Sequence, residues 1–284
     1  MPKLADQEWV EEVQEGAYGM KWRVKEVLLR AKSPFQSVEV VDTVSHGRML
    51  LIDGLLMTSE RDEFVYHEMI AHVPLFLHPR PRRVLIIGGG DGGTAREALR
   101  HPGVEKVVLV EIDGLVVDAA RKFLPQTSAA LSDPRVEVRI EDGVKYMARR
   151  GEGFDVILVD STDPIGPAQP LFGSKFYADV KRRLTSNGIA VAQGENPFYG
   201  MDAQKSLLGV VKGAFGAAAL YNYHNLTYPG GLWSFVIASK APRDLRAPDL
   251  GRVAVLQPLL RYYNAETHKA AFALPQFMKL GLAH

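Results

Sequence analysis

A buried strand that runs into a glycine-rich turn and then a helix is the feature that most constrains how this chain can fold. A run of four apolar residues, 84–87, is followed by Gly88, Gly90 and Gly93, which have the spacing G-x-G-x-x-G. Glu111 comes eighteen residues later, at the end of the next predicted strand, where a carboxylate can accept hydrogen bonds from both hydroxyls of a ribose. Tight strand-to-helix turns also need glycine for steric reasons alone. Strand, helix and acidic residue together favour a nucleoside-binding site over a purely structural turn.

The rest of the chain has two patterns, which divide near residue 60. Residues before Arg61 are typical of short strands and turns, with strands predicted at 22–30, 36–44 and 48–52. After Arg61, strands and helices alternate. We expect strands at 84–87, 106–110, 136–140, 155–159, 188–193, 217–222 and 232–239, and helices at 63–76, 94–100, 114–123, 143–150, 174–184 and 203–213.

Alternation of this kind predicts the α/β class. The expected architecture is a Rossmann-like, doubly wound parallel sheet with helices on both faces, preceded by a small N-terminal antiparallel β domain. We expect the β domain to occupy residues 1–60 and the Rossmann-like domain residues 61–284.

Composition excludes several classes of protein. Lys and Arg number 34 against 33 Asp and Glu, so the chain lacks the basic excess typical of nucleic-acid binders. There are no cysteines, which removes disulfides, thiolate nucleophiles and Cys-ligated metals. The acidic N-terminal segment has no apolar core of a signal peptide, and the apolar runs are too short to cross a bilayer. We therefore expect a cytoplasmic protein that acts on small molecules and binds neither nucleic acid nor membrane.

Asp91 lies inside the glycine-rich turn and narrows the choice of nucleoside. The pyrophosphate of a dinucleotide would have to lie at this turn, where a second anion at short range is unfavourable. The corresponding part of the ligand is therefore neutral or cationic. This argues against NAD and for a sulfonium such as S-adenosylmethionine or a relative of it.

Asp142 and Gly143 follow another predicted strand, so they should lie at the carboxyl edge of the sheet, where ligands bind in doubly wound folds. Asp142 is placed to accept a hydrogen bond from an adenine amino group. It could equally cap the N-terminus of the helix that follows. The two roles are compatible, and the sequence leaves both open.

The segment Asp160-Ser161-Thr162-Asp163-Pro164-Ile165-Gly166-Pro167-Ala168 ends a further strand. Its proline and glycine residues exclude a regular α-helix, and such a loop could close over a ligand. Asp and Pro also form ordinary turns. Two carboxylates here, together with Asp91 and Glu111, nevertheless predict a strongly acidic pocket that concentrates cations and repels carboxylates.

These motifs, taken in order, resemble the polyamine aminopropyltransferases, the spermidine synthase family. The resemblance runs from Trp9 nearly to the C-terminus. It includes, besides the glycine-rich turn and the loop after Asp160, the segments Leu51–Gly54, Glu60–Met69, Val110–Asp113, Gln193–Glu195, Thr227–Pro229, Arg261–Asn264 and His268–Pro275.

The resemblance implies a methyltransferase-type Rossmann-like domain that carries an N-terminal β domain, with decarboxylated S-adenosylmethionine as aminopropyl donor and methylthioadenosine as by-product. It implies a gating loop from about Asp160 to Ser174 and a homodimer or homotetramer. The donor-binding residues it implies are Gln36, Gly88, Gly90, Asp91, Glu111, Asp142, Gly143, Asp160 and Pro167. The acceptor-binding residues are Tyr66, His67, Asp163, Gln193 and Tyr228, and the catalytic base is Asp160.

The chemistry fits this assignment. An alkylamine has a pKa near ~10, so one nitrogen must lose a proton before it can attack the carbon beside the sulfonium. Asp160 is the expected base, with Tyr66 or Tyr228 as hydrogen-bond partners. Asp163 would hold the acceptor chain and Asp91 the terminal ammonium of the donor. The same acids would repel the carboxylate of ordinary S-adenosylmethionine. No metal or bound cofactor is expected, because a sulfonium already leaves readily.

Two rival functions share part of this pattern: an S-adenosylmethionine-dependent methyltransferase, and a silent polyamine-binding protein. Putrescine is the first choice of acceptor, with agmatine, cadaverine and spermidine as alternatives. His67, where some relatives carry Gln, could face the acceptor or be structural. Trp9 and Trp233 could line the cleft or pack. His72, His78 and His101 are interpreted as surface or packing residues.

Overall fold

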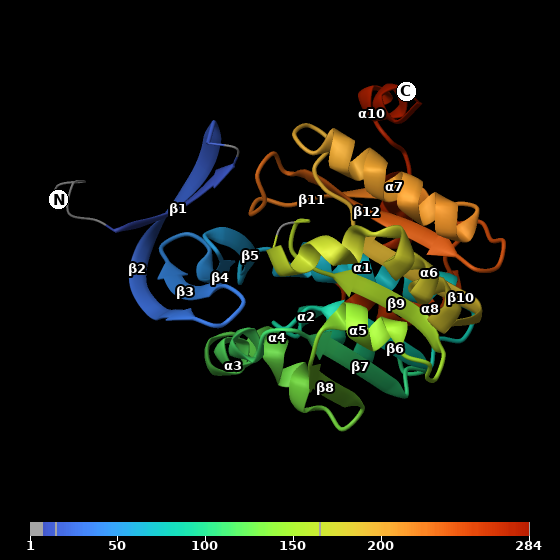
Figure 1. Ribbon diagram of the computed structural model, residues 1–284, viewed down its shortest axis with the longest axis horizontal. Helices are drawn as coiled ribbons and strands as arrows, with labels where there is room; N and C mark the ends of the chain where they lie inside the picture. The colour runs from blue at the N-terminus through green and yellow to red at the C-terminus, as the bar shows by residue number, and fades with distance from the viewer. Residues whose placement is uncertain (1–7, 15, 165, 284) are drawn as a thin grey trace.

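The computed structural model describes residues 8–14, 16–164 and 166–283 and contains two β-sheets (Figure 1). A five-stranded sheet is formed by the N-terminal residues, and a seven-stranded sheet with helices on both faces is formed by the rest. In Figure 1 the five-stranded sheet stands at one side of the larger α/β body. The predicted fold class, Rossmann-like with a small N-terminal antiparallel unit, is confirmed.

The N-terminal sheet is antiparallel throughout, with its strands in chain order. Its strands are β1 (Trp9–Gln14), β2 (Tyr18–Lys32), β3 (Ser37–Thr43), β4 (Gly47–Ile52) and β5 (Leu55–Ser59). β2, β3 and β4 correspond to the predicted strands, whereas β1 and β5 were not predicted. β5 follows β4 through a two-residue turn in which Asp53 and Gly54 have φ values of 49° and 81°. Two left-handed residues are what a tight hairpin between twisted strands requires.

The larger sheet has the strand order β11-β12-β10-β9-β6-β7-β8. Its strands are β6 (Arg83–Gly88), β7 (Lys106–Glu111), β8 (Val136–Ile140), β9 (Phe154–Asp160), β10 (Leu184–Gln193), β11 (Ala219–His224) and β12 (Leu232–Ser239). The pairs from β10 to β8 are parallel, as predicted, but β12 runs antiparallel to both of its neighbours. The expected parallel sheet is therefore present from β10 to β8 but not at this edge, where residues 225–231 join β11 to β12 as an antiparallel pair.

Helices cover both faces of this sheet. They are α1 (Glu63–Leu77), α2 (Gly93–Leu99), α3 (Gly114–Phe123), α4 (Pro125–Ser128), α5 (Gly143–Ala148), α6 (Ser174–Arg183), α7 (Met201–Phe215), α8 (Leu250–Leu256), α9 (Ala265–Ala271) and α10 (Gln276–Ala283), with short 3₁₀ segments at Ala129–Ser132, Gly166–Phe172 and Gln257–Leu259. The sequence predicted the helices from α1 to α7 except α4. It did not predict α8, α9 or α10.

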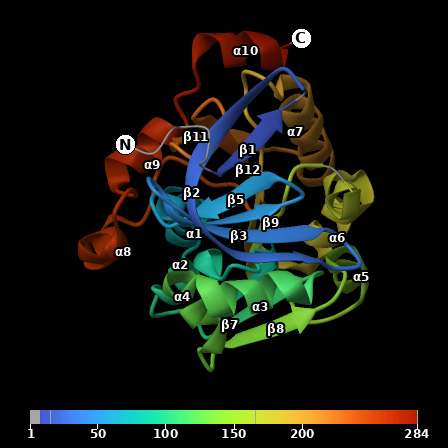
Figure 2. The same ribbon diagram turned by 90° about the vertical axis from the view of Figure 1, so that its left-hand side faces the viewer.

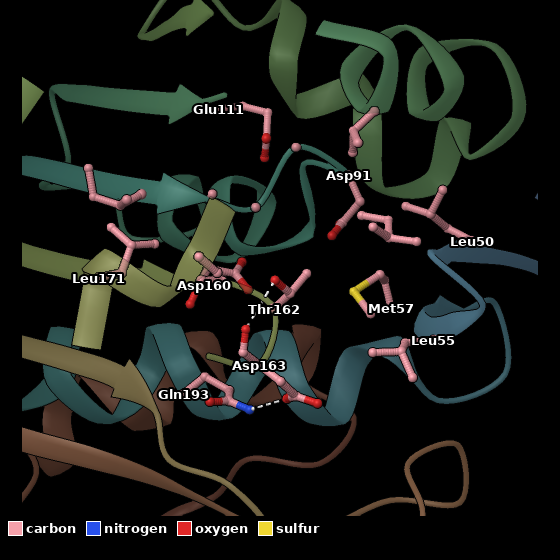
Figure 3. Close-up of a pocket in the computed structure, with 18 of the residues that line it drawn as sticks. Leu50, Leu55, Met57, Asp91, Glu111, Asp160, Thr162, Asp163, Leu171 and Gln193 are labelled. Carbon is pink, nitrogen blue, oxygen red and sulfur yellow. Dashed lines mark hydrogen bonds between the residues drawn. The ribbon is translucent and has the colours of Figure 1, made fainter. Parts of the chain in front are cut away.

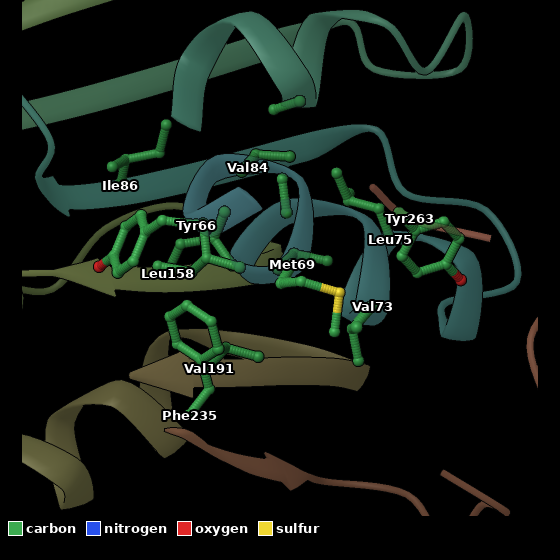
Figure 4. Packing of buried hydrophobic residues seen from close by; sticks show 14 of the residues in the cluster. Tyr66, Met69, Val73, Leu75, Val84, Ile86, Leu158, Val191, Phe235 and Tyr263 are labelled. Carbon is green, nitrogen blue, oxygen red and sulfur yellow. The ribbon is translucent and has the colours of Figure 1, made fainter. Parts of the chain in front are cut away.

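Alternate residues of each strand face opposite layers, which is why the strands are apolar along their whole length. Ile86 on β6 packs with α1 in one core, and its neighbour Ile87 packs in the other with α5, α6 and α7. α1 is buried on nearly every side, and Figure 4 shows Met69 and Val73 on α1 between the strand residues and Tyr263. α1 is therefore a fixed central support for any side chain that it carries.

The strand order reverses beside β6. The chain goes from β6 to β7 and β8 on one side, then returns to β9 on the other. Such a switch point leaves a crevice outside the carboxyl ends of the two strands. The N-terminal sheet packs against the same region, where Val38 and Leu50 contact Val116 and Ala120 of α3 (Figure 2). Among the described residues, no helix is long and apolar enough to cross a membrane.

Candidate active site

One deep pocket lies at this switch point, between the carboxyl ends of the central strands and the inner face of the N-terminal sheet. Every site residue predicted from the sequence lines it: Gln36, Tyr66, His67, Gly88, Gly90, Asp91, Glu111, Asp142, Gly143, Asp160, Asp163, Pro167, Gln193 and Tyr228. Figure 3 shows Asp91, Glu111 and Asp160 around a common space. The structure therefore brings the predicted residues together, and their individual roles stay predictions.

Glycine is needed in the turn because β9 and β7 approach the backbone closely. A Cβ on Gly88, which has a φ of 84°, would lie 2.0 Å from the Asp160 carbonyl oxygen. A Cβ on Gly90 would lie 3.0 Å from the Glu111 carboxylate. Gly89 donates its N–H to the Asp160 carbonyl at 2.9 Å. The turn thus fixes Asp160 and Glu111 on either side of one opening.

At the β7 and β8 end, the carboxylates are held by backbone amides. Glu111 accepts the N–H of Asp113 at 3.0 Å, and burial raises the pKa of Glu111 to about 7. Asp142 accepts the N–H groups of Val144 and Lys145 at 2.9 and 3.2 Å. The predicted N-cap role of Asp142 is therefore confirmed. Its predicted contact with adenine stays a prediction.

Asp160 ends β9 in the centre of the pocket, with a hydrogen bond to each carboxylate oxygen. Tyr66 on α1 donates its hydroxyl to Oδ1 at 2.7 Å, and Thr94 on α2 donates to Oδ2 at 2.6 Å. Burial, followed by the nearby charge of Asp91, raises the pKa of Asp160, while His67 and the two hydroxyls oppose that rise. A carboxylate oriented in this way and raised in pKa is suited to accept a proton near neutral pH. Thr94 was missed by the sequence analysis, because its contact joins residues 66 positions apart.

His67 connects Asp91 to a buried chain of alternating charges. Its Nδ1 lies 2.5 Å from Glu63 Oε2, and its Nε2 lies 3.3 Å from Asp91 Oδ1. Arg96 donates to both oxygens of Glu63, at 2.9 and 2.8 Å. Although burial disfavours its charged form, Asp91 and Glu63 raise the pKa of His67 to about 10. Gly93 makes room for this ring, since a Cβ there would lie 2.1 Å from it. Because both ring nitrogens have carboxylate partners, a direct acceptor contact of His67 stays a prediction.

The opposite end of the pocket carries a second acidic group. Gln193, at the end of β10, donates its Nε2 to Asp163 at 3.1 Å (Figure 3). The same nitrogen donates more weakly to Glu195 at 3.4 Å. Burial raises the pKa of Asp163, and burial together with the charge of Asp163 raises the pKa of Glu195 to about 8. Neighbouring carboxylates that are buried away from water are destabilised in their charged form, so a cation that binds between them stabilises them strongly.

Comparison with known proteins identifies the family. Residues 8–60 match a model described as the spermidine synthase tetramerisation domain, and residues 63–247 match the spermine/spermidine synthase domain. The chain belongs to the spermidine synthase family of polyamine aminopropyltransferases. The resemblance predicted from the sequence is thus confirmed, and the chain is an aminopropyltransferase.

Relatives and solved structures agree with this assignment over nearly the whole chain. Polyamine aminopropyltransferases of Bacillus subtilis and Clostridium kluyveri are 46% and 47% identical, each over 95% of this chain and over 97% and 98% of their own length. A spermidine synthase solved with the transition-state analogue AdoDATO is 42% identical, with a TM-score of 0.94 over 97% of this chain and 95% of that one. Spermidine synthase from Thermotoga maritima is 41% identical, with a TM-score of 0.91 over 97% and 94%.

Several pocket residues of this aminopropyltransferase were not singled out from the sequence. Glu12 on β1 accepts the N–H of Leu56 at 2.8 Å and the amide of Gln14 at 2.7 Å. Burial raises the pKa of Glu12, and Asp163 adds to that rise. Tyr223 on β11 also lines the pocket. Glu12 was missed because β1 was not predicted. Trp233, for which the sequence left cleft and packing open, lines the pocket and also belongs to the hydrophobic core, so both alternatives hold.

Three histidines away from the pocket need a correction. His72, His78 and His101 are 0%, 4% and 2% exposed, so the surface alternative was wrong and the packing alternative is right. His72 lies 2.9 Å from His101 and 3.1 Å from Glu97. Sequence alone could not place His72 inside, because α1 is buried on its outer as well as its inner side.

Proposed function

We propose that this enzyme transfers the aminopropyl group of decarboxylated S-adenosylmethionine to putrescine, and that it releases methylthioadenosine and spermidine. The amine nitrogen attacks the aminopropyl carbon bonded to sulfur, forming a C–N bond. The C–S bond breaks with its electron pair going to sulfur, and the nitrogen gives up one proton. The observation that carries the proposal is the Asp160 carboxylate, held by Tyr66 and Thr94 in the centre of an acidic pocket.

Asp160 is the proposed base. Its pKa is raised by burial and by Asp91, so it is a better proton acceptor than an exposed carboxylate. Tyr66 keeps its own proton, because burial and the charge of Asp160 raise the pKa of Tyr66 well above its usual value. Tyr66 therefore orients the carboxylate without competing with it. The other source of rate enhancement is the alignment of two cationic reactants that repel each other in water.

The donor is proposed to lie along β6, β7 and β8. Glu111 would accept the ribose hydroxyls, Asp142 the adenine amino group, and Asp91 would hold the terminal ammonium. Gln36, directly before β3, and Pro167 from the loop after β9 would close this end, and the glycine turn lets the nucleoside approach the backbone. The proposed donor residues are Gln36, Gly88, Gly90, Asp91, Glu111, Asp142, Gly143, Asp160 and Pro167.

The same acids support selection against ordinary S-adenosylmethionine. Its extra carboxylate would lie beside Asp91 and Asp160, and like charges in a desolvated site repel strongly. The decarboxylated donor has an ammonium alone at this position. Charge complementarity therefore favours the decarboxylated donor over ordinary S-adenosylmethionine, both when the donor binds and when it reacts.

The acceptor is proposed to extend from Asp160 toward Asp163, through Tyr66, His67, Gln193 and Tyr228. Asp163, Glu195 and Glu12 form a second acidic group at the far end, linked through the charge effects described above. Two separated acidic centres, one around Asp160 and one around Asp163, match an amine with two nitrogens. This supports a diamine such as putrescine over a monoamine.

Assembly, domain limits, gating and location are also proposals. We propose a homo-oligomer built through the N-terminal unit, since residues 8–60 match a model described as a tetramerisation domain. We also propose that residues 1–60 and 61–284 are the two domains, that residues 160–174 gate the pocket, and that the enzyme is cytoplasmic and works without a metal. Ile165 lies outside the described residues.

The experiment that tests the reaction is product analysis by mass spectrometry. The enzyme is incubated with either decarboxylated or ordinary S-adenosylmethionine and with putrescine, agmatine, cadaverine or spermidine in turn. Release of methylthioadenosine, with spermidine formed from putrescine at the highest kcat/KM, supports the proposal. Release of S-adenosylhomocysteine would instead assign methyl transfer. Tight polyamine binding without any product would assign a silent binding protein.

A further inference from the structure

Tyr223 on β11 has a buried hydroxyl that no described residue engages. Its side chain is 0% exposed, and its hydroxyl oxygen has no hydrogen-bond partner among residues 8–14, 16–164 and 166–283. The residue nevertheless lines the pocket. A buried hydroxyl without a partner is unfavourable, and such groups are rare in native structures. An unpaired buried hydroxyl that lines a binding pocket therefore indicates a ligand that pairs with it.

The ring of Tyr223 is fixed by its neighbours, so the hydroxyl has little freedom to find another partner. It stacks on Phe235 of β12, with centroids 4.8 Å apart, and meets the ring of Tyr66 edge-on at 5.8 Å. Tyr66 is the residue that donates to Asp160. The Tyr223 ring is thus part of the rigid wall beside the proposed base.

The surroundings of the hydroxyl are acidic. Burial raises the pKa of Tyr223 well above its usual value, and the charges of Glu195, Asp160 and Asp163 add to that rise. The hydroxyl therefore stays protonated and neutral, and its lone pairs are available to a donor. Gln193 carries a second unpaired oxygen in the same wall. Its amide nitrogen donates a hydrogen bond to Asp163, while its Oε1 has no partner among the described residues.

We propose that the Tyr223 hydroxyl binds the acceptor amine. Its oxygen accepts a hydrogen bond from an alkylammonium nitrogen that lies between the acidic centre around Asp160 and the one around Asp163. Gln193 Oε1 accepts a second hydrogen bond from the same substrate. The chemistry of these groups indicates the class of ligand. An alkylammonium cation has several N–H groups, so it can donate to both unpaired oxygens and to the adjoining carboxylates at once. This inference rests on the proposed function and adds a specificity residue to it.

Tyr221 provides a matched control on the same strand. It is also 0% exposed and packs on Phe235, at 5.2 Å between centroids. Its hydroxyl, however, donates to the Met69 carbonyl at 3.0 Å. Removing the hydroxyl of Tyr221 breaks a hydrogen bond within the protein, whereas removing that of Tyr223 breaks none with any residue that the structure describes. A purely structural role and a ligand-binding role therefore give opposite results for the two tyrosines.

The test compares Tyr223→Phe and Tyr221→Phe with wild type. Steady-state kinetics are measured with decarboxylated S-adenosylmethionine and putrescine (1,4-diaminobutane), and thermal unfolding is followed in parallel. A calorimetric titration of 1,4-diaminobutane into enzyme saturated with methylthioadenosine gives the Kd directly. For Tyr223→Phe we expect the amine KM and Kd to rise by about 10- to 100-fold, as for loss of a hydrogen bond to a charged group. The donor KM should stay within twofold, and Tm should be unchanged or higher.

Tyr221→Phe should show the reverse pattern, a lower Tm with an unchanged amine KM. An amine KM and Kd within twofold of wild type in Tyr223→Phe would overturn the inference while leaving the proposed reaction intact. Wild-type enzyme that neither turns over nor binds 1,4-diaminobutane would overturn both. The two failures are therefore distinguishable.

Discussion

The two ends of the pocket are built differently. At the donor end, Glu111 and Asp142 accept backbone N–H groups from within three residues of themselves. At the acceptor end, Asp163 and Gln193 meet from residues 30 positions apart, and Tyr223 reaches the wall from another strand. Orphan oxygens on Gln193 and Tyr223 remain there among the described residues.

The end with Glu111 and Asp142 is therefore preformed, whereas the end with Asp163 and Gln193 still has polar atoms without hydrogen-bond partners among the described residues. Carboxylates that already hold backbone amides are oriented before any ligand arrives, which suits a nucleoside recognised by its fixed hydroxyl and amino groups. Carboxylates whose pKa is raised by burial and by each other gain most from an arriving cation. Under the proposed function, local turns would set the recognition of the donor, and side chains distant in sequence would set the choice of the amine.

The largest effect is expected at Asp160, which lies between the two ends. Asp160→Asn should lower kcat by about 10²- to 10⁴-fold, because it removes the proton acceptor. Methylthioadenosine release measures the rate, and thermal unfolding should show an intact fold. Thr94→Val removes only one hydrogen bond to the same carboxylate and should cost far less. A near-wild-type rate in Asp160→Asn would remove it from the base role.

The next effect tests the acceptor end alone. Asp163→Asn should raise the amine KM by about 10- to 100-fold, as a charge-assisted hydrogen bond is lost, and leave the donor KM nearly unchanged. Asp142→Asn is the matched change at the donor end and should act on the donor KM instead. Equal effects of both variants on both substrates would show that the two ends are not separate.

A smaller effect should appear in the pH dependence of donor binding. Glu111 has its pKa raised to about 7, so its carboxylate is increasingly protonated below that pH. Methylthioadenosine should therefore bind more tightly as the pH rises from 6 to 8, by about fivefold to tenfold, since each pKa unit is worth tenfold in the charged form. Calorimetric titration across this range measures it. Glu111→Gln should bind more weakly and show no such slope; a slope that persists would assign the ionisation to another group.

The smallest effect is expected at Tyr228, whose hydroxyl donates to the Met57 carbonyl of β5 at 2.7 Å. Tyr228→Phe should lower the unfolding free energy by about 1 kcal/mol, the usual net value of such a bond. Because Tyr228 lines the pocket and is a proposed acceptor-binding residue, the amine KM should also rise, but only a few-fold. Urea denaturation and steady-state kinetics provide the two numbers. A donor KM that changes more than the amine KM would place Tyr228 at the wrong end.

Periodicity and turn chemistry predicted the order of most elements between β2 and β12, because apolar runs and glycine turns are local signals. The C-terminal helices escaped prediction, since α8 and α9 have seven residues each and, unlike the equally short α2, do not follow directly after a strand and its turn. β1 escaped because its burial is irregular, with Glu12 buried and Val13 54% exposed. A charged residue faces inward there only because the pocket lies beneath it.

The sequence by itself determined the nucleoside turn, the acidic residues at the ends of three strands and, through its motifs, the family. These features are encoded by residues close together in the chain, whose geometry a turn or a strand end dictates. Only the tertiary structure decided that Thr94 and Tyr66 share Asp160, that His67 lies between two carboxylates, and that the Tyr223 hydroxyl has no partner in the part of the chain that the structure describes. Those facts depend on how α1, α2 and β11 pack around the switch point, and packing joins residues that no sequence spacing relates.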